Sequence, residues 1–432
     1  MTSCLHTTTD EHRNPLPPSG TRARISAGVV AMLFRRAVAG LPLRVEFPDG
    51  TVLGAHADSD PLPRMIIRDP SAFFARLGRH GLIGFGESYT AGEWTAPDPA
   101  AVLTVLATDL TRLIPPALQR FRALLPAPPA GEIGTADNAR DNIEHHYDLS
   151  NELFHTFLDE TMTYSSALFD PAEMAAGPAR WERLARAQRR KIDVLLDAAG
   201  VRAGSRVLEI GTGWGELCVR AAARGATVHS VTLSARQQEL ARLRVAAAGY
   251  ADSVRIELRD YREIQGSYDA IVSVEMIEAV GYRHWETYFR CLDRYLAPGG
   301  RIALQAITMP HRRMLATRNT YTWIQKYIFP GGFLPSSEAI ADTAARHTRL
   351  RVRSEFGFGT HYAETLRLWR ERFDSRTADI ESLGFDGRFR RIWQFYLAYS
   401  EAGFRSGYLD VRHIVLDRPE EQSWASEIAD CR

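Results

Sequence analysis

This sequence contains few cysteines and has a formal net charge close to zero. The four cysteines, Cys4, Cys218, Cys291 and Cys431, are scattered and form no CxxC pair. This spacing argues against a disulfide framework or a zinc site and favours reduced thiols in a cytoplasmic protein. The 53 basic and 52 acidic residues give a formal net charge of +1, whereas nucleic-acid-binding proteins usually carry a basic surface. We therefore expect no metal ion and no nucleic-acid partner.

Long apolar runs are missing as well. A membrane-spanning helix needs about 20 consecutive apolar residues, and the nearest candidate, ISAGVVAMLF at 25–34, has about half that length. Arg35 and Arg36 follow this run, whereas a signal peptide carries its positive charge before the apolar segment. We expect a helix packed on its own domain. A helix on a membrane surface, with its arginines towards anionic headgroups, is the alternative.

Changes in composition divide the 432 residues into four parts. The polar, proline-containing segment 1–24 predicts a disordered tail, and 25–125 predicts a small α+β domain. PAPPAGEIGTAD at 126–137 predicts a linker. The second domain then spans 138–432 and includes an aromatic and basic insertion at 309–336 that could cover a long apolar chain.

Turn signals organise the first domain. The segment 44–53 contains Pro-Asp-Gly between two short apolar runs and predicts a hairpin. A third strand is expected at 65–67. The sequence from Pro70 begins as a helix and then predicts a glycine-rich loop up to Trp94, with another helix at 100–113.

Strands and helices alternate through most of the second domain, with short turns between them. This alternation predicts an α/β fold with a doubly wound, mainly parallel sheet, which binds ligands at the carboxyl ends of its strands. The expected strands are 206–210, 227–232, 254–258, 268–274 and 301–307, and the expected helices are 181–199, 235–248 and 285–296.

The segment RVLEIGTGWGELCVRAAARG at 206–225 is typical of a buried strand, a glycine turn and a helix. Gly211, Gly213 and Gly215 differ in spacing from the GxGxxG fingerprint of dinucleotide-binding proteins. Glu209 would repel a diphosphate but suits a cationic group, such as the amino or sulfonium group of S-adenosylmethionine. Taken alone, such a turn is about as often a plain tight turn as a ligand site.

Polar residues also follow the second and third strands. Ser234 is explained as a helix cap, and Gln237 could reach a ribose hydroxyl. Asp260 and Tyr261 could bind an adenine through the carboxylate and the ring.

Two carboxylates follow the fourth strand. Glu275 and Glu278 lie among apolar residues, where a charge requires a partner or a function. Surface capping is the alternative.

These motifs resemble the cyclopropane fatty-acid synthases, which use S-adenosylmethionine to modify the double bond of unsaturated acyl chains in phospholipids. The resemblance is closer to the tuberculostearic methyltransferase branch, through GRHGLIGFGESYTAGEW at 78–94 and AITMPHRRMLATR at 306–318. The other motifs are HYDLSNELF (146–154), DETMTYSSALF (159–169), VLEIGTGWG (207–215), VTLSARQ (231–237), RDYR (259–262), EMIEAVG (275–281), WIQKYIFPGGFLPS (323–336), HYAETLRLWRERF (361–373) and YSEAGFRSGYLD (399–410).

The resemblance implies a class I methyltransferase fold, which is Rossmann-like with a mainly parallel seven-stranded sheet and a helical cap. It also implies how S-adenosylmethionine is held. The implied contacts are Tyr164 and Ser165 at the methionine end, residues 207–215 as the floor, Thr232 to Gln237 at the ribose, and Tyr261 and Arg262 at the adenine.

A bicarbonate ion that acts as the general base is a further implication of the resemblance. Its implied pocket consists of Ser166, Glu278, Gln305, the backbone near Ile307, and Tyr362. Ser166 and Gln305 stand where many members have cysteine and histidine. A hydroxyl and an amide can still hydrogen-bond an anion.

The implied reaction methylates the alkene and leaves a carbocation, which aromatic faces can stabilise. Direct proton loss closes a cyclopropane. A prior hydride shift gives an exocyclic methylene, which a separate reductase could convert to a methyl branch. The aromatic candidates are Tyr164, Phe169, Trp323, Tyr327, Phe329 and Tyr362.

The branch match and the altered Ser166 and Gln305 favour conversion of an oleoyl phospholipid to a 10-methylene-stearoyl product. A cyclopropane synthase and a non-catalytic lipid-binding protein on the same fold are the alternatives. We expect a peripheral position at the inner face of the membrane, and a homodimer is a further hypothesis.

Overall fold

The computed structural model describes residues 21–54, 62–109 and 150–419. The predicted linker at 126–137 and most of the predicted tail lie outside these ranges. The tail prediction is wrong at its end, because helix α1 (Thr21–Val38) already begins at Thr21.

A seven-stranded sheet forms the core of the second domain, as predicted, with the strand order β10-β11-β9-β8-β5-β6-β7. The five strands from β9 to β7 pair in parallel, whereas β11 pairs antiparallel with both β9 and β10. The strands are β5 (Arg206–Ile210), β6 (Thr227–Thr232), β7 (Val254–Leu258), β8 (Tyr268–Val274), β9 (Leu296–Thr308), β10 (Arg351–Gly357) and β11 (Asp410–Asp417).

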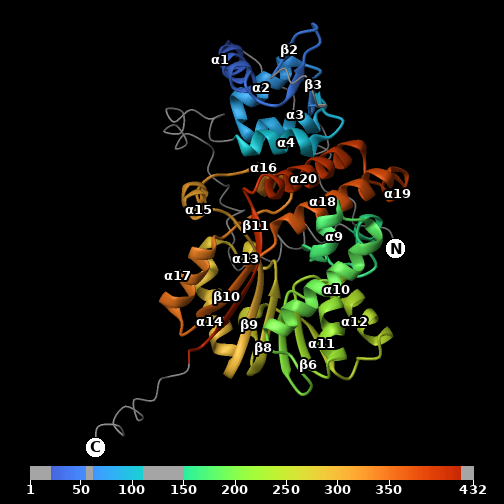
Figure 1. The fold of residues 1–432 in the computed structure, drawn as a ribbon, viewed down its shortest axis with the longest axis vertical. Coiled ribbons are helices and arrows are strands. Elements are labelled where there is room, and N and C mark those ends of the chain that lie inside the picture. Colours follow the sequence, from blue (N-terminus) through green and yellow to red (C-terminus); the bar gives the residue numbers. More distant parts are fainter. Residues whose placement is uncertain (1–20, 55–61, 110–149, 420–432) are drawn as a thin grey trace, which may run out of the picture.

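Helices cover both faces of this sheet (Figure 1). One apolar cluster joins the sheet to α10 (Trp181–Ala198), α11 (Glu216–Ala223) and α12 (Ala235–Ala247). A second cluster joins the other face to α14 (Trp285–Tyr295) and α17 (Ser337–His347). The central strands β5 and β8 are rich in apolar residues because both of their faces are buried.

A helical cap lies beyond one end of the sheet (Figure 1). Short helices within the insertion 309–336 adjoin the cap. The cap helices are α8 (Asn151–Phe157), α9 (Pro171–Ala176), α18 (Gly359–Ser375), α19 (Thr377–Ser382) and α20 (Gly387–Arg405), and the insertion contains α15 (His311–Thr317) and α16 (Trp323–Tyr327).

The first domain contains a small sheet of strand order β2-β1-β3-β4, in which β1 and β2 form the predicted hairpin. Helices pack on this sheet and on one another. The elements are β1 (Arg44–Glu46), β2 (Val52–Leu53), β3 (Arg64–Ile67), β4 (Trp94–Thr95), α2 (Pro70–His80), α3 (Leu82–Thr90) and α4 (Pro99–Thr108).

The predicted glycine-rich loop after α2 is wrong, because α3 occupies that segment. Burial of Phe85 and Tyr89 against Trp94 favours the helix despite its glycines. Gly86 has a packing role, since a Cβ there would lie 2.4 Å from the Trp323 ring.

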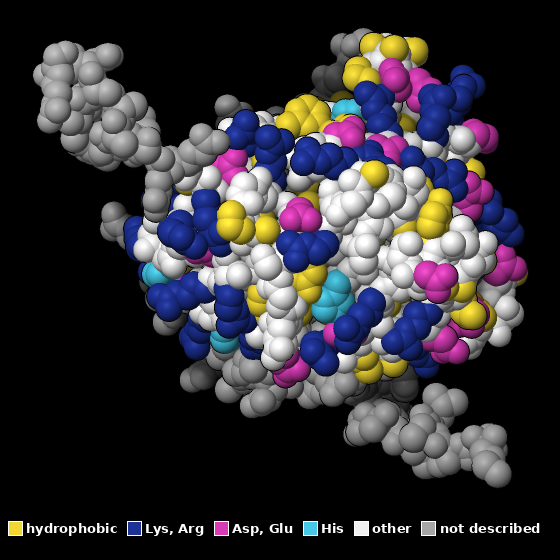
Figure 2. Space-filling view, turned by 90° about the horizontal axis from the view of Figure 1, so that it is seen from below, with side chains coloured by type: hydrophobic (Ala, Val, Ile, Leu, Met, Phe, Trp, Pro, Cys, Tyr) yellow, Lys and Arg dark blue, Asp and Glu magenta, His cyan; other side chains and the backbone are white. Residues whose placement is uncertain are grey.

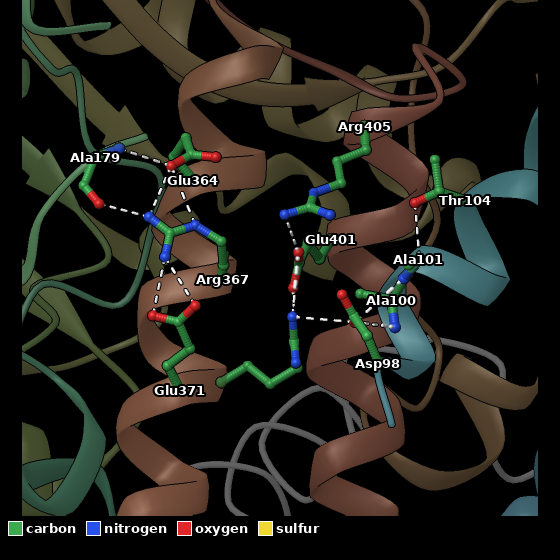
Figure 3. A network of polar contacts seen from close by, with 11 residues as sticks. Asp98, Ala100, Ala101, Thr104, Ala179, Glu364, Arg367, Glu371, Glu401 and Arg405 are labelled. Atoms are coloured by element: carbon green, nitrogen blue, oxygen red, sulfur yellow. Dashed lines mark hydrogen bonds and ion pairs between the residues drawn. The ribbon is translucent and has the colours of Figure 1, made fainter. Parts of the chain in front are cut away.

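A network of ion pairs that includes a buried pair in the cap extends to the first domain (Figure 3). Arg370 of α18 donates to Glu401 of α20 at 2.8 Å, and it lies 3.4 Å from Asp98, which caps α4. Arg405 also pairs with Glu401, whose side chain is completely buried. The two domains also share one apolar cluster. The first domain is therefore docked on the cap.

No helix of the described residues is long and apolar enough to cross a membrane. Seen from below, the second domain shows Lys and Arg side chains with Asp and Glu between them, and its hydrophobic side chains are scattered (Figure 2).

Glu401→Gln should lower the free energy of unfolding by about 3 kcal/mol, because it removes the charge that compensates a buried guanidinium. The matched control is Glu381→Gln, since Glu381 pairs with Arg390 but its side chain is 53% exposed. The control should cost less than about 1 kcal/mol. Denaturant titrations of both variants measure the difference, and equal losses would contradict this account of the interface.

Candidate active site

The carboxyl ends of β5, β6, β7 and β8 meet at one edge of the sheet, since these strands run parallel. The predicted cofactor residues of the second domain follow these ends in the chain, so the structure gathers them at that edge. The cap lies on the same side, because the loop 164–166 and Tyr362 of α18 contact Glu275 after β8.

The glycine turn after β5 requires glycine for more than one reason. Gly211, Gly213 and Gly215 have φ angles of 94°, 52° and 90°, which other residues rarely adopt. A Cβ at Gly211 would also lie 2.6 Å from Met276. At Gly213 a Cβ would meet nothing within 4 Å. The backbone at this glycine is therefore open to a ligand.

Glu209 lies inside the protein beside this turn. Its Oε2 accepts hydrogen bonds from Ser230 Oγ at 2.6 Å and Cys218 Sγ at 2.8 Å. Burial raises the pKa of Glu209 to about 7. These contacts support a role in holding the turn in place, and the predicted contact with a cationic ligand group stays a prediction.

The predicted ribose residues are brought together, since Thr232 Oγ1 donates to Gln237 Oε1 at 2.9 Å. Ser234 caps α12, as expected for this residue. The side chains of Thr232 and Gln237 are buried beneath the edge of the sheet. They can present one polar pair to a sugar.

The predicted adenine residues form a second small group after β7. Arg262 Nε donates to Asp260 Oδ1 at 2.8 Å, and the Arg262 guanidinium lies 5.7 Å from the centre of the Tyr261 ring. This pairing lowers the pKa of Asp260 against the opposing effect of burial. The carboxylate is therefore ionised at neutral pH, and the ring of Tyr261 packs edge-on against Tyr288.

The predicted methionine-end residues contact the cap and α10. Tyr164 OH lies 2.7 Å from Tyr396 OH of α20. Lys191 Nζ donates to Ser165 Oγ at 2.6 Å. Burial lowers the pKa of Lys191 to about 8, although the charge of Glu275 opposes this effect. Lys191 stands among the arginines of an amphipathic helix in the sequence, yet its side chain is completely buried.

Glu275 occupies the centre of the site. Its Oε1 accepts hydrogen bonds from Ser166 N at 3.0 Å and from Gln305 Nε2 at 2.7 Å, and its Oε2 accepts from Tyr362 OH at 2.7 Å. Burial raises the pKa of Glu275, while the charge of Lys191 and these hydrogen bonds oppose that rise. Three of the four predicted catalytic residues therefore meet at a carboxylate that was not among them.

His413 of β11 orients the Gln305 amide. Its Nε2 lies 3.0 Å from Gln305 Oε1. Burial lowers the pKa of His413 to about 3, so the ring is neutral at neutral pH. Because Gln305 Nε2 donates to Glu275, its Oε1 is the acceptor and His413 Nε2 carries the hydrogen.

Glu278, the fourth predicted catalytic residue, lies beside this group in α13 (Ile277–Val280). Its Oε1 accepts from Ile307 N at 2.5 Å, and its buried Oε2 has no hydrogen-bond partner among the described residues. Burial, followed by the charge of Glu275, raises the pKa of Glu278 to about 8. At neutral pH Glu278 is therefore mainly protonated, whereas Glu275 has the hydrogen-bond donors and the nearby Lys191 that favour its charged form.

The family model of mycolic acid cyclopropane synthetase matches residues 135–414. The chain belongs to this family. It is 58% identical over 403 residues to the tuberculostearic acid methyltransferase of Mycobacterium tuberculosis, covering 93% of each chain. It is 33% identical to the cyclopropane-fatty-acyl-phospholipid synthase of Escherichia coli, covering 82% of this chain and 88% of that one.

Solved structures agree with this membership. A mycolic acid cyclopropane synthase in complex with S-adenosylhomocysteine (SAH) and CTAB aligns with a TM-score of 0.57 at 30% identity, covering 64% of this chain and 97% of that one. The chain is thus an S-adenosylmethionine-dependent methyltransferase. The open backbone at Gly213 and the polar groups after β6 and β7 fit this cofactor.

A bicarbonate ion, as the family resemblance implied, does not fit the pocket as it stands. The donors that would bind it, on Ser166, Gln305 and Tyr362, already bind Glu275. Ile307 N already binds Glu278. The side-chain hydroxyl of Ser166 instead donates to Ala167 O.

The six predicted aromatic residues do not form one group. Tyr362 and Tyr164 lie together around Trp369, at ring distances of 6.3 and 5.4 Å. Trp323 instead packs on Phe395 at 4.6 Å, and Tyr327 OH donates to Glu87 of the first domain. Trp323 and Tyr327 therefore serve the domain interface. Phe329 packs on Tyr396, whereas Phe169 stacks on His361.

Glu275, Lys191 and His413 are the site residues that sequence reasoning missed as catalytic or positioning groups. Glu275 carried a signal, since a second carboxylate lies three residues before Glu278 among apolar neighbours. Lys191 had none, because it is surrounded in the sequence by the arginines of an amphipathic helix.

Glu209→Gln should remove a pH dependence of stability. The pKa of Glu209 in the folded protein, about 7, exceeds the ordinary glutamate value of 4.5. The stability from the protonated acid is therefore complete below about pH 4.5 and is lost as pH rises through about 7. The variant should gain stability relative to the unmodified enzyme over this window, by on the order of 3 kcal/mol at most. Unfolding titrations at several pH values measure the difference, which should stay constant above about pH 8. A difference independent of pH would contradict the assignment.

Proposed function

We propose that this enzyme transfers a methyl group to the cis double bond of an oleoyl chain in a phospholipid and releases a 10-methylene-stearoyl product. The observation that carries the proposal is the 58% identity, over 93% of both chains, to a tuberculostearic acid methyltransferase. A separate reductase would then have to convert the methylene to a methyl branch.

The residues around the site suit a reaction that passes through a cation. Bound S-adenosylmethionine supplies an electrophilic methyl group. The alkene is a weak nucleophile, so the protein must hold it close to the donor in a site without water. Tyr362, Phe404 and Trp369 offer ring faces, with Tyr362 and Phe404 4.5 Å apart. Such faces stabilise a nearby cation by about 1–2 kcal/mol when water is excluded.

The order of the hydride shift and the proton loss decides the product, and the position of the base affects that order. A base beside the methylated carbon favours proton loss from the new methyl group, and the hydride shift determines whether this loss yields a ring or an alkene. The Glu275 side chain is fixed in position by hydrogen bonds from Gln305 and Tyr362. The cyclopropane product remains the second candidate, because the Escherichia coli relative is a cyclopropane-fatty-acyl-phospholipid synthase.

Incubation of the enzyme with S-adenosylmethionine and a dioleoyl phospholipid should yield an exocyclic methylene. Proton NMR of the released fatty acid distinguishes the vinylidene protons from the high-field protons of a cyclopropane, whereas intact mass does not, because the products are isomers. A cyclopropane without an alkene would reject the methylene product. The control without S-adenosylmethionine should return oleate unchanged.

We further propose that α1 contacts the surface of the membrane that holds the substrate. Val29 and Met32 lie on one side of α1 and are 50% and 63% exposed. Arg35 and Arg36 follow in its last turn. Apolar side chains beside arginines suit the boundary between acyl chains and anionic headgroups.

Val29→Asp with Met32→Asp should reduce sedimentation with anionic phospholipid vesicles and lower turnover on vesicles, while S-adenosylmethionine binding stays unchanged. Leu243→Asp is the matched control, since Leu243 is 62% exposed on α12. If the double variant still binds vesicles but changes from a dimer to a monomer in light scattering, α1 is a dimer interface and the membrane proposal fails.

A further inference from the structure

We propose that the Glu275 carboxylate takes the place of bicarbonate in this enzyme and itself accepts the proton that the methylated acyl chain loses. This inference rests on the proposed function. It assigns the base of that reaction to a side chain, and it makes turnover independent of bicarbonate.

The first argument is occupancy. Glu275 receives hydrogen bonds from Ser166 N, Gln305 Nε2 and Tyr362 OH at 3.0, 2.7 and 2.7 Å. A planar anion with two or three oxygens would need these same donors. A carboxylate and a bicarbonate share the planar O–C–O group, so one can replace the other but both cannot be held at once.

The second argument is charge. Lys191 is the cation that acts on Glu275 from within the core, and its side chain is completely buried. With Glu278 protonated, the carboxylate of Glu275 balances the ammonium group of Lys191. A bicarbonate ion would add a negative charge to a site of low dielectric constant, where like charges repel strongly.

The backbone provides the third argument. Glu275 has a φ angle of +51°, a conformation that costs a non-glycine residue on the order of 1 kcal/mol or more and persists where the surroundings enforce it. Three hydrogen bonds and the Glu275 N to Gln305 O bond at 2.7 Å supply that enforcement. The side chain is thereby directed towards the cap rather than along the sheet.

The chemical step balances with this base. Methyl transfer breaks the sulfur–methyl bond, whose electron pair stays on sulfur, and forms a C–CH₃ bond at one alkene carbon. A hydride then moves from the methylated carbon to its cationic neighbour. A C–H bond of the new methyl group breaks, its electron pair forms the exocyclic C=C bond, and the proton goes to Glu275.

Glu275 Oε2 is the oxygen that suits this step. It accepts one hydrogen bond, from Tyr362 OH, so a lone pair remains for the proton. Burial raises the pKa of Glu275, which makes the carboxylate a stronger base than an exposed glutamate. Tyr362 also presents its ring towards Phe404 and Trp369, so base and ring faces lie side by side.

The first test uses the unmodified enzyme. Turnover of dioleoyl phospholipid should be the same in buffer purged of carbon dioxide and in buffer with added bicarbonate. A rate that rises severalfold with bicarbonate would overturn the inference. Absence of any methylated product would instead reject the proposed function, so the two failures are distinguishable.

The second test uses variants. Glu275→Gly removes the carboxylate and suits the positive φ, whereas Glu275→Gln keeps the shape without the charge. Both should lose about 10²-fold or more in kcat. Added bicarbonate or formate should restore the glycine variant by about tenfold, but not the glutamine variant, whose amide still fills the pocket. Glu278→Ala is the matched control and should not be rescued, because Glu275 still occupies the three donors.

A binding measurement completes the test without turnover. ¹³C-bicarbonate should show saturable line broadening with Glu275→Gly and none with the unmodified enzyme or with Glu278→Ala. Binding to the unmodified enzyme, rescue of Glu278→Ala, or an unchanged rate of Glu275→Gly in purged buffer would each overturn the inference. Thermal shifts with S-adenosylmethionine confirm that each variant is folded.

Discussion

One buried carboxylate, that of Glu275, determines how the two halves of the methyltransferase domain meet. The cost of burying a charge requires partners on every side. These partners come from the loop at 164–166, from β9, and from the cap helix α18. The sheet and the cap therefore meet at one carboxylate, and a shift of either would break hydrogen bonds to it.

This arrangement separates two functions in space. The glycine turn and the polar groups after β6 and β7 suit the methyl donor. The fate of the acyl chain depends on groups that the cap and β11 bring to the end of β8, including His413 through Gln305. Substitutions in the cap or β11 can therefore change which product forms without altering the glycine turn that suits the cofactor.

The sheet was predictable from the sequence because its signals are local. Apolar strands, the glycine turn at 211–215 and the periodicity of α10 and α12 each follow from neighbouring residues. The helix α3 was missed because its apolar contacts outweigh the low helix propensity of Gly84 and Gly86. Glu275 and Lys191 acquire their roles through contacts more than 80 residues away in sequence, or through burial, which no local pattern encodes.

The docking of the first domain has a consequence for the family core. The family model begins at residue 135, so residues 21–109 are an addition to it. Yet Phe395 and Trp323, which lie inside the family segment, pack on Tyr89, Trp94 and Gly86. Truncation of the chain to residues 135–414 would expose these aromatic side chains to solvent and favour aggregation. The first domain thus covers an apolar surface that belongs to the family segment.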